Sequence, residues 1–167
     1  EVGSARGDTA FFFAPLVGEV VGIDAAEPAV AAARAAGAAR GLGNVRFEAA
    51  DSRDLAPFAE GSFDAVLLAD FVEHVTDDVL RPSLAEAFRV LVPAGVLAIY
   101  TPNRDHWAER VKAAVPGLQR PDHIAVRPAA EVVRLVEGAG FSVDDLFFSA
   151  SPYPLLGALD RLFSGAG

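Results

Sequence analysis

A short loop of small residues near the start of the chain constrains the fold more than any other feature. Residues 1–8 read Glu-Val-Gly-Ser-Ala-Arg-Gly-Asp, and an apolar run follows up to Val17. Because Gly3, Ala5 and Gly7 carry almost no side-chain bulk, a polar ligand can approach the backbone there. The pattern therefore predicts the end of a strand, a loop of the nucleotide-binding type and a helix, in that order.

An acidic residue at the end of the next apolar run supports this interpretation. Val20-Val21-Gly22-Ile23 is followed directly by Asp24. A carboxylate at the tip of a parallel strand can accept hydrogen bonds from both ribose hydroxyls, which would compensate the cost of placing it there. The loop and Asp24 together predict a Rossmann-like site for an adenosine group. A helix N-cap for residues 27–39 is the alternative role for Asp24.

Two later motifs extend the series. Asp51-Ser52 follows a third apolar segment, and residues 89–95 read Arg-Val-Leu-Val-Pro-Ala-Gly. With these motifs the chain resembles the class I S-adenosylmethionine-dependent methyltransferases over nearly its whole length. The resemblance implies an α/β fold: a Rossmann-like doubly wound, mostly parallel sheet with helices on both faces. We expect the first strand to be incomplete, with Glu1-Val2 as its end, and a seventh strand to be absent or supplied by sequence outside this chain.

Apolar, β-branched runs alternate with helical segments along the chain, which by itself predicts a parallel sheet. We expect a single domain over residues 1–167, with a cofactor half at about 1–100 and a substrate-side half at about 101–167. The predicted strands cover residues 19–23, 45–47, 63–68, 96–100 and 141–149. The predicted helices cover residues 8–16, 27–39, 77–91, 104–114, 128–138 and 155–163.

Composition limits the possible functions. The chain has no Cys, which excludes disulfides and thiolate sites, and no Met, which suggests a piece of a longer protein truncated at both ends. A net charge of −9 argues against a nucleic-acid partner, since such affinity is built on Lys and Arg contacts to phosphates. No membrane-spanning run or signal pattern is visible. We expect a cytoplasmic protein that acts on a small-molecule acceptor, while the oligomeric state stays open.

The resemblance implies a set of residues that bind S-adenosyl-L-methionine and its product S-adenosyl-L-homocysteine. The loop would hold the methionine part, Asp24 the ribose and Asp51 the adenine amino group. The family usually has Gly at the position of Ala5, and we expect Ala5 to be tolerated if its φ is negative. Glu1 could instead be a frayed terminal charge, and Asp51 an ordinary turn residue. The implied cofactor-binding residues are Glu1, Gly3, Ala5, Gly7, Asp24, Ala25, Asp51, Ser52 and Ala69.

The reaction centre is predicted just after the fourth strand. The i, i+3 and i+4 spacing of Asp70, Glu73 and His74 would place them on one side of a helical turn. With His123 they could hold Mg²⁺ or Mn²⁺. This pattern is similar to the Glu-x-x-Glu-His motif of ubiquinone-biosynthesis O-methyltransferases and small-RNA 2′-O-methyltransferases, with Asp as a shorter first ligand. We prefer the interpretation without metal, in which His74 is a general base toward an acceptor hydroxyl; His106 and His123 are alternatives for that role.

The sequence is compatible with three classes of function. The leading one is a small-molecule methyltransferase that acts on oxygen. An NAD-dependent oxidoreductase would also use a glycine loop and an acidic residue, but neither Tyr100 nor Tyr153 is followed four residues later by Lys, and Asp51 would have no role. The third class is a methyltransferase-like module that binds the cofactor, or keeps only the fold, without catalysis.

Overall fold

Two pairs of parallel strands form the frame of the protein in a computed structural model, which describes residues 1–115 and 117–148. Strand β1 (Val20–Asp24) pairs with β2 (Val45–Ala49), and β3 (Phe63–Ala69) pairs with β4 (Leu91–Tyr100). Val2 joins the two pairs, because it forms a parallel bridge with Ile23 and its amide donates to the Leu67 carbonyl at 2.9 Å. The order across the frame is therefore β2, β1, Val2, β3 and β4, as expected for the α/β class.

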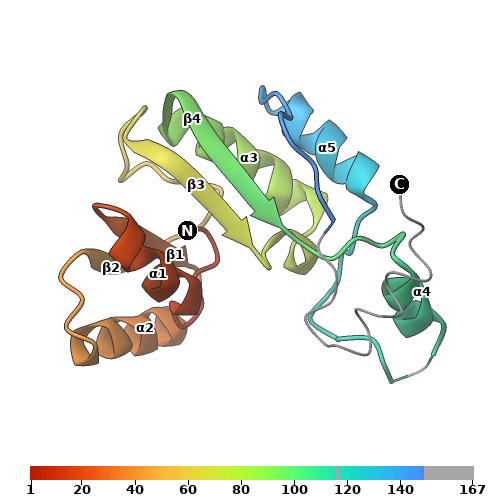
Figure 1. Ribbon diagram of the computed structural model, residues 1–167, viewed down its shortest axis with the longest axis horizontal. Coiled ribbons are helices and arrows are strands. Elements are labelled where there is room, and N and C mark those ends of the chain that lie inside the picture. The colour runs from red at the N-terminus through yellow and green to blue at the C-terminus, as the bar shows by residue number, and fades with distance from the viewer. Residues whose placement is uncertain (116, 149–167) are drawn as a thin grey trace.

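Helices connect the strands, as the alternation of the sequence predicts (Figure 1). Pro15 lies in a 3₁₀ turn that continues the first helix, and Pro28 lies in the first turn of the second. None of the helices in the described part of the chain has the length and apolar character needed to cross a membrane. The helical elements are α1 (Asp8–Phe13), η1 (Ala14–Leu16), α2 (Glu27–Ala39), η2 (Val72–His74), α3 (Asp77–Val90), α4 (Trp107–Ala114) and α5 (Ala129–Gly138).

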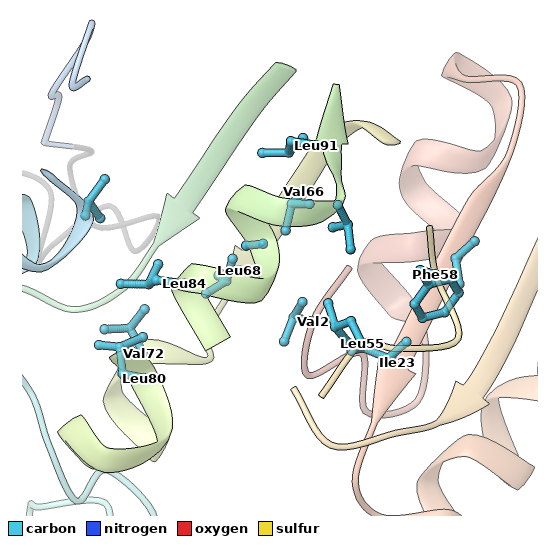
Figure 2. Close-up of a cluster of buried hydrophobic side chains, with 14 of the residues drawn as sticks. Val2, Ile23, Leu55, Phe58, Val66, Leu68, Val72, Leu80, Leu84 and Leu91 are labelled. Carbon is cyan, nitrogen blue, oxygen red and sulfur yellow. The ribbon is translucent and has the colours of Figure 1, made fainter. Parts of the chain in front are cut away.

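The strand β1 contributes to two separate cores. Val21 and Ile23 belong to a large cluster in which Val2 packs with residues of β3 and α3 (Figure 2). Val20 instead packs on a smaller cluster that contains Phe47. Successive strand side chains point to opposite faces, so β1 is covered on both. Its tip, which ends in Asp24, is thereby held in a fixed place.

Most predicted elements are present, and two differ. The strand β4 begins at Leu91 rather than near Val96, and its pairing with β3 shifts register between Phe63 and Ala65. The predicted strand at 141–149 is wrong, since residues 141–148 form no strand and Phe147 and Phe148 are exposed. A strand needs a partner edge for its backbone hydrogen bonds, and β4 pairs only with β3 among the described residues. Residue 149 and the predicted helix 155–163 lie outside the described residues.

Candidate functional site

The glycine loop is tied directly to the tip of β1. The Ala5 amide donates to Asp24 Oδ2 at 2.8 Å, and the Ala26 amide donates to Asp24 Oδ1 at 2.8 Å. The Gly3 amide also donates to the Ile23 carbonyl, at 2.9 Å. Ala26, and not Asp24, is the N-cap of α2. The Asp24 carboxylate therefore lies between the loop and the next helix, and each oxygen keeps a lone pair that a hydroxyl can use.

Two phenylalanine rings pack closely against the glycines of the loop. Gly7 has φ +85°, and a Cβ atom there would lie 2.4 Å from Phe47 Cζ. Gly3 has φ +75°, and a Cβ atom there would lie 2.8 Å from Phe71 Cδ2. Both positions therefore need glycine for two reasons, the left-handed backbone and the lack of space.

Ala5 corrects one expectation. Its φ is +44°, in the left-handed region, so the condition under which we expected Ala5 to be tolerated, a negative φ, is not met. An L-residue in that region costs roughly 1–2 kcal/mol, because its Cβ approaches the following carbonyl oxygen. The methyl group of Ala5 is thus a source of backbone strain at the loop.

The half-buried side chain of Glu1 lies against the first turn of α1, at Thr9 and Ala10, and is not a frayed terminal charge. Burial raises the pKa of its carboxyl, and hydrogen bonds from Thr9 and Ala10 oppose that rise. Its Oε2 is buried and has no hydrogen-bond partner within the described residues. An oxygen in that position can accept a hydrogen bond from an ammonium group placed at the loop.

The Asp51-Ser52 pair already has protein partners. Arg53 donates to Asp51 through Nε at 3.0 Å and Nη2 at 2.6 Å, and through its backbone amide at 2.9 Å. The hydrogen bond from the Arg53 side chain is the largest cause that lowers the pKa of Asp51 to about 2. Ser52 Oγ accepts from Ser83 Oγ at 2.7 Å. An adenine amino group would therefore have to share or displace the Arg53 contact, and an ordinary turn role for Asp51 also fits.

The remaining predicted cofactor residues lie at strand tips. Ala25 follows Asp24 and is exposed, and Ala69 is the last residue of β3, paired with Tyr100. Both are small residues at the carboxyl ends of parallel strands, where ligands bind in open α/β sheets.

A second cluster lies beyond β3. Glu73 and His74 come from η2, and His123 comes from a distant loop; one potential ligand atom from each lies within 4.8 Å of the others. The His74 and His123 rings meet edge to face with centroids 5.0 Å apart. The chain thus brings one carboxylate and two imidazoles together, a donor set suited to a divalent ion or to proton transfer.

Glu73 and His74 are both oriented by neighbours. Glu73 is 1% exposed, and its Oε2 accepts from Thr101 Oγ1 at 3.0 Å, whereas its Oε1 is buried without a partner among the described residues. His74 Nδ1 lies 2.8 Å from the Asp122 carbonyl oxygen. Because a carbonyl only accepts, we assign the proton to Nδ1, which leaves Nε2 as the acceptor nitrogen.

Asp70 is not part of this cluster. It is exposed, its φ is +49°, and the 3₁₀ turn begins only at Val72. The helical turn that we expected to carry Asp70 beside Glu73 and His74 is therefore not formed. His106 has a structural role as the N-cap of α4, where it accepts from the Ala108 amide at 3.3 Å.

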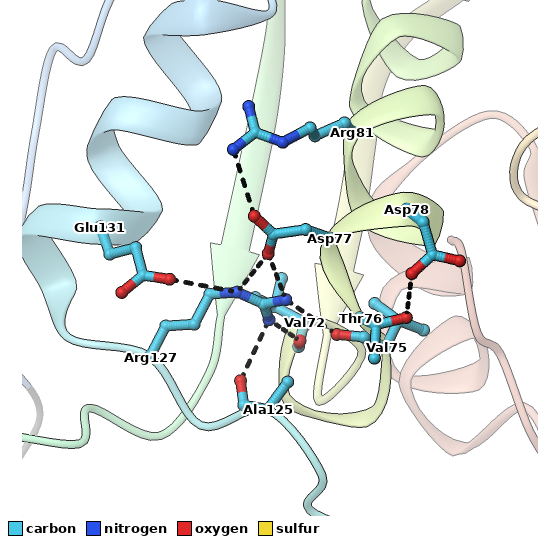
Figure 3. A network of polar contacts seen from close by, with 9 residues as sticks. All are labelled: Val72, Val75, Thr76, Asp77, Asp78, Arg81, Ala125, Arg127 and Glu131. Atoms are coloured by element: carbon cyan, nitrogen blue, oxygen red, sulfur yellow. Dashed lines mark hydrogen bonds and ion pairs between the residues drawn. The ribbon is translucent and has the colours of Figure 1, made fainter.

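Arg127 is the residue that sequence reasoning missed. It is 5% exposed and contacts both ends of the turn that carries Glu73 and His74 (Figure 3). An arginine directly before Pro128 carries no local signal of burial, because loop arginines are usually solvated.

Comparisons with known proteins agree with this geometry. Residues 1–95 match the family described as "Methyltransferase domain". The chain is 34% identical over 152 residues to a probable S-adenosylmethionine-dependent methyltransferase of Mycolicibacterium smegmatis, covering 87% of this chain and 52% of that one. It is 41% identical over 106 residues to the nocamycin O-methyltransferase of Saccharothrix syringae, covering 61% and 36%. The chain therefore spans about half, or less, of the length of these relatives.

A solved structure supports the same likeness. The crystal structure of YcgJ from Bacillus subtilis superimposes with a TM-score of 0.67 at 25% identity. The match covers 83% of this chain and 58% of YcgJ.

Proposed function

This chain belongs to the methyltransferase domain family, within the class I S-adenosylmethionine-dependent methyltransferases, and from that premise we propose that it transfers a methyl group to an oxygen of a small molecule. The observation that supports the proposal most is the Asp24 carboxylate, tied to the glycine loop at the tip of β1. A carboxylate at this point suits the vicinal hydroxyls of a ribose. The net charge of −9 favours a small acceptor over a nucleic acid.

In the proposed complex the cofactor lies over the loop. The backbone at Gly3, Ala5 and Gly7 surrounds its methionine part, and its ammonium group donates to Glu1 Oε2, which has no partner in the part of the chain that the structure describes. Asp24 binds the ribose. The adenine end lies toward Asp51, and the remaining wall is formed by Ala25, Ser52 and Ala69.

Methyl transfer from a sulfonium is an in-line substitution, so the protein has to align the two reactants, exclude water and accept a proton. We assign proton removal to His74, whose Nδ1 is held by the Asp122 carbonyl and whose Nε2 can accept. An imidazole has an unperturbed pKa close to neutrality, which suits a general base for a hydroxyl. The name of the Saccharothrix syringae relative also supports oxygen as the acceptor atom.

A divalent metal at Glu73, His74 and His123 is a second candidate. Glu73 Oε1 has no hydrogen-bond partner among the described residues, and one ligand atom from each of the three groups lies within 4.8 Å of the others, which fits a small ion. A bound ion would supply Lewis acidity toward an acceptor hydroxyl. We place the metal-free assignment first, because Asp70, the first ligand of the expected set, lies outside the cluster that the described residues form.

Calorimetric titration with S-adenosylhomocysteine, and separately with NAD, tests the cofactor. We expect saturable binding of S-adenosylhomocysteine alone. Binding of NAD instead would favour the oxidoreductase, and binding of neither would leave a module that keeps only the fold.

Transfer from methyl-labelled S-adenosylmethionine to a panel of hydroxyl, amine and carbon acceptors tests the chemistry. His74→Asn keeps an N–H donor toward the Asp122 carbonyl but removes the acceptor nitrogen. We expect it to lower kcat by roughly 10²–10⁴-fold, the usual contribution of a general base, without changing cofactor affinity. A cofactor-binding protein that transfers to no acceptor would support the non-catalytic alternative.

A Mn²⁺ titration with S-adenosylhomocysteine present separates the two acceptor-side candidates. Saturable binding at low micromolar metal that is lost in both Glu73→Gln and His74→Ala would make the metal site the better assignment. Because metal ligands must be deprotonated, such binding should also weaken as the pH is lowered.

A further inference from the structure

Arg127 uses its whole guanidinium group in contacts inside the protein. Nη1 donates to the Val72 carbonyl at 2.6 Å and to the Ala125 carbonyl at 3.0 Å. Nη2 donates to the Val75 carbonyl at 2.9 Å and to Asp77 Oδ1 at 2.8 Å, and Nε donates to Asp77 Oδ1 at 3.2 Å (Figure 3). Each of the five N–H groups of an arginine therefore has an acceptor.

These contacts surround the residues of the acceptor-side cluster. The carbonyls of Val72 and Val75 flank Glu73 and His74 directly in the sequence. On the other side, the Ala125 carbonyl belongs to the segment 122–127 that carries His123. Arg127 thus binds the turn on both sides of the cluster and the loop that brings the distant histidine to it.

Two further hydrogen bonds join the same two segments. The Ala125 amide donates to the Glu73 carbonyl at 3.0 Å, and the Asp122 carbonyl accepts from His74 Nδ1 at 2.8 Å. Single hydrogen bonds of this kind contribute little net free energy, about 0.5–1.5 kcal/mol each. The buried guanidinium group of Arg127 donates charge-assisted hydrogen bonds to several acceptors, so it fixes the relative position of the two segments more strictly than these single bonds do.

We propose that Arg127 is a positioning residue, which sets the separation of His123 from the Glu73–His74 pair by clamping segment 122–127 onto the turn 72–75. The catalytic consequence rests on the function proposed above, but the geometric claim does not. A lysine could not replace Arg127, because its single ammonium cannot reach carbonyls on both sides of the fork.

The alternative is that Arg127 only stabilises the fold through its ion pair with Asp77. The chain offers a matched control for this. Arg81 also donates to Asp77, at 3.1 Å, but its side chain is 64% exposed and it lies one turn away on α3. Loss of Arg81 removes a contact to Asp77 without touching the clamp on the turn.

The experiment compares Arg127→Lys, Arg127→Gln and Arg81→Gln with the parent protein. The first readout is the nuclear Overhauser effect between the ring C–H groups of His74 and His123, which needs neither cofactor nor acceptor. The second is S-adenosylhomocysteine affinity, and the third is kcat and KM with an acceptor that the parent methylates. Circular dichroism at low temperature checks that each variant is folded.

We expect both Arg127 variants to lose the His74–His123 signal. Their kcat should fall roughly tenfold or more, because small misplacements in a reaction centre are costly. The dissociation constant of S-adenosylhomocysteine should change less than about twofold. Arg81→Gln should retain all three. A His74–His123 signal that persists in a folded Arg127→Gln, or its loss in Arg81→Gln, would overturn the proposal. Global unfolding of both Arg127 variants would also overturn it, because Arg127 would then be a general stabiliser. If the parent methylates nothing, the proposed function fails while the ring signal still decides the role of Arg127.

Discussion

The two halves of the candidate site are assembled in different ways. On the cofactor side, the Gly3 and Ala5 amides donate to the tip of β1, so the hydrogen bonds that hold the loop lie within the first 26 residues. On the acceptor side, Glu73 and His74 meet His123, and their supports come from Thr101, Asp122 and Arg127. The cofactor side is formed by residues close together in the sequence, whereas the acceptor side forms only when distant segments of the chain pack together.

The two halves also use different physical means. The cofactor side relies on glycines with positive φ and on backbone amides that converge on one carboxylate. The acceptor side relies on buried polar groups: Glu73, one of whose oxygens has no partner within residues 1–115 and 117–148, and Arg127, whose donors are all used. A larger side chain at a loop glycine should therefore disturb the cofactor side most, whereas removal of a charged partner should disturb the acceptor side most.

The largest effect is expected for Gly7→Ala. The new methyl group would meet the Phe47 ring at 2.4 Å on a backbone with φ +85°. Strain of an L-residue together with overpacking should lower the free energy of unfolding by roughly 2–4 kcal/mol in urea denaturation. The control is Gly41→Ala, at φ +66° with no atom within 4 Å, which should cost only about 1 kcal/mol. Equal losses in the two variants would show that Phe47 does not confine the loop.

Asp24→Ala should have the next largest effect, mainly on cofactor binding, with a smaller loss of stability because the Ala5 and Ala26 amides lose their acceptor. Loss of hydrogen bonds to a charged group should weaken S-adenosylhomocysteine binding by roughly 1.5–3 kcal/mol in a calorimetric titration. Glu27→Ala, an exposed acid at the start of α2, is the control and should bind like the parent. If Asp24→Ala binds within a factor of two of the parent, the adenosine site lies elsewhere.

Ala5→Gly should stabilise the protein. Relief of the φ +44° strain exceeds the extra unfolded-state entropy of glycine, for a net gain of roughly 0.5–1 kcal/mol. Cofactor binding should be equal or tighter. Ala94→Gly, at φ +64° in β4, should give a similar gain in stability with unchanged binding. Weaker cofactor binding in Ala5→Gly alone would mean that the Ala5 methyl group makes a useful contact.

The smallest effect concerns the exposed Asp51–Arg53 pair. The hydrogen bond from Arg53 lowers the pKa of Asp51 from 3.8 to about 2, so its stabilisation is complete above about pH 4 and is lost as the pH falls through 2. Exposed ion pairs contribute little, so Arg53→Gln should reduce thermal stability slightly at pH 7. The difference between variant and parent should shrink as the pH is lowered from 4 toward 2. A difference that does not change over this range would point to a cause other than the ion pair.

Local patterns were sufficient for much of the cofactor side. The alternation of apolar runs indicated a parallel sheet, the small residues at 3, 5 and 7 indicated the loop, and Asp24 followed from the end of an apolar strand. Such features can be predicted from short stretches of sequence, because the strand, the loop and the helix that form them are consecutive in the chain. The sequence also indicated that Glu73 and His74 belong together, since they are adjacent.

Tertiary structure decided the rest. The sign of φ at Ala5, the exclusion of Asp70 and the lack of a strand over 141–148 depend on how the chain turns and which edge it meets. His123 lies beside Glu73 and His74 because its segment docks, partly through the buried Arg127, on a turn about 50 residues away in the chain. A side chain's partners across such a separation are set by the packing of whole elements, and the residues on either side of Arg127 carry no trace of that packing.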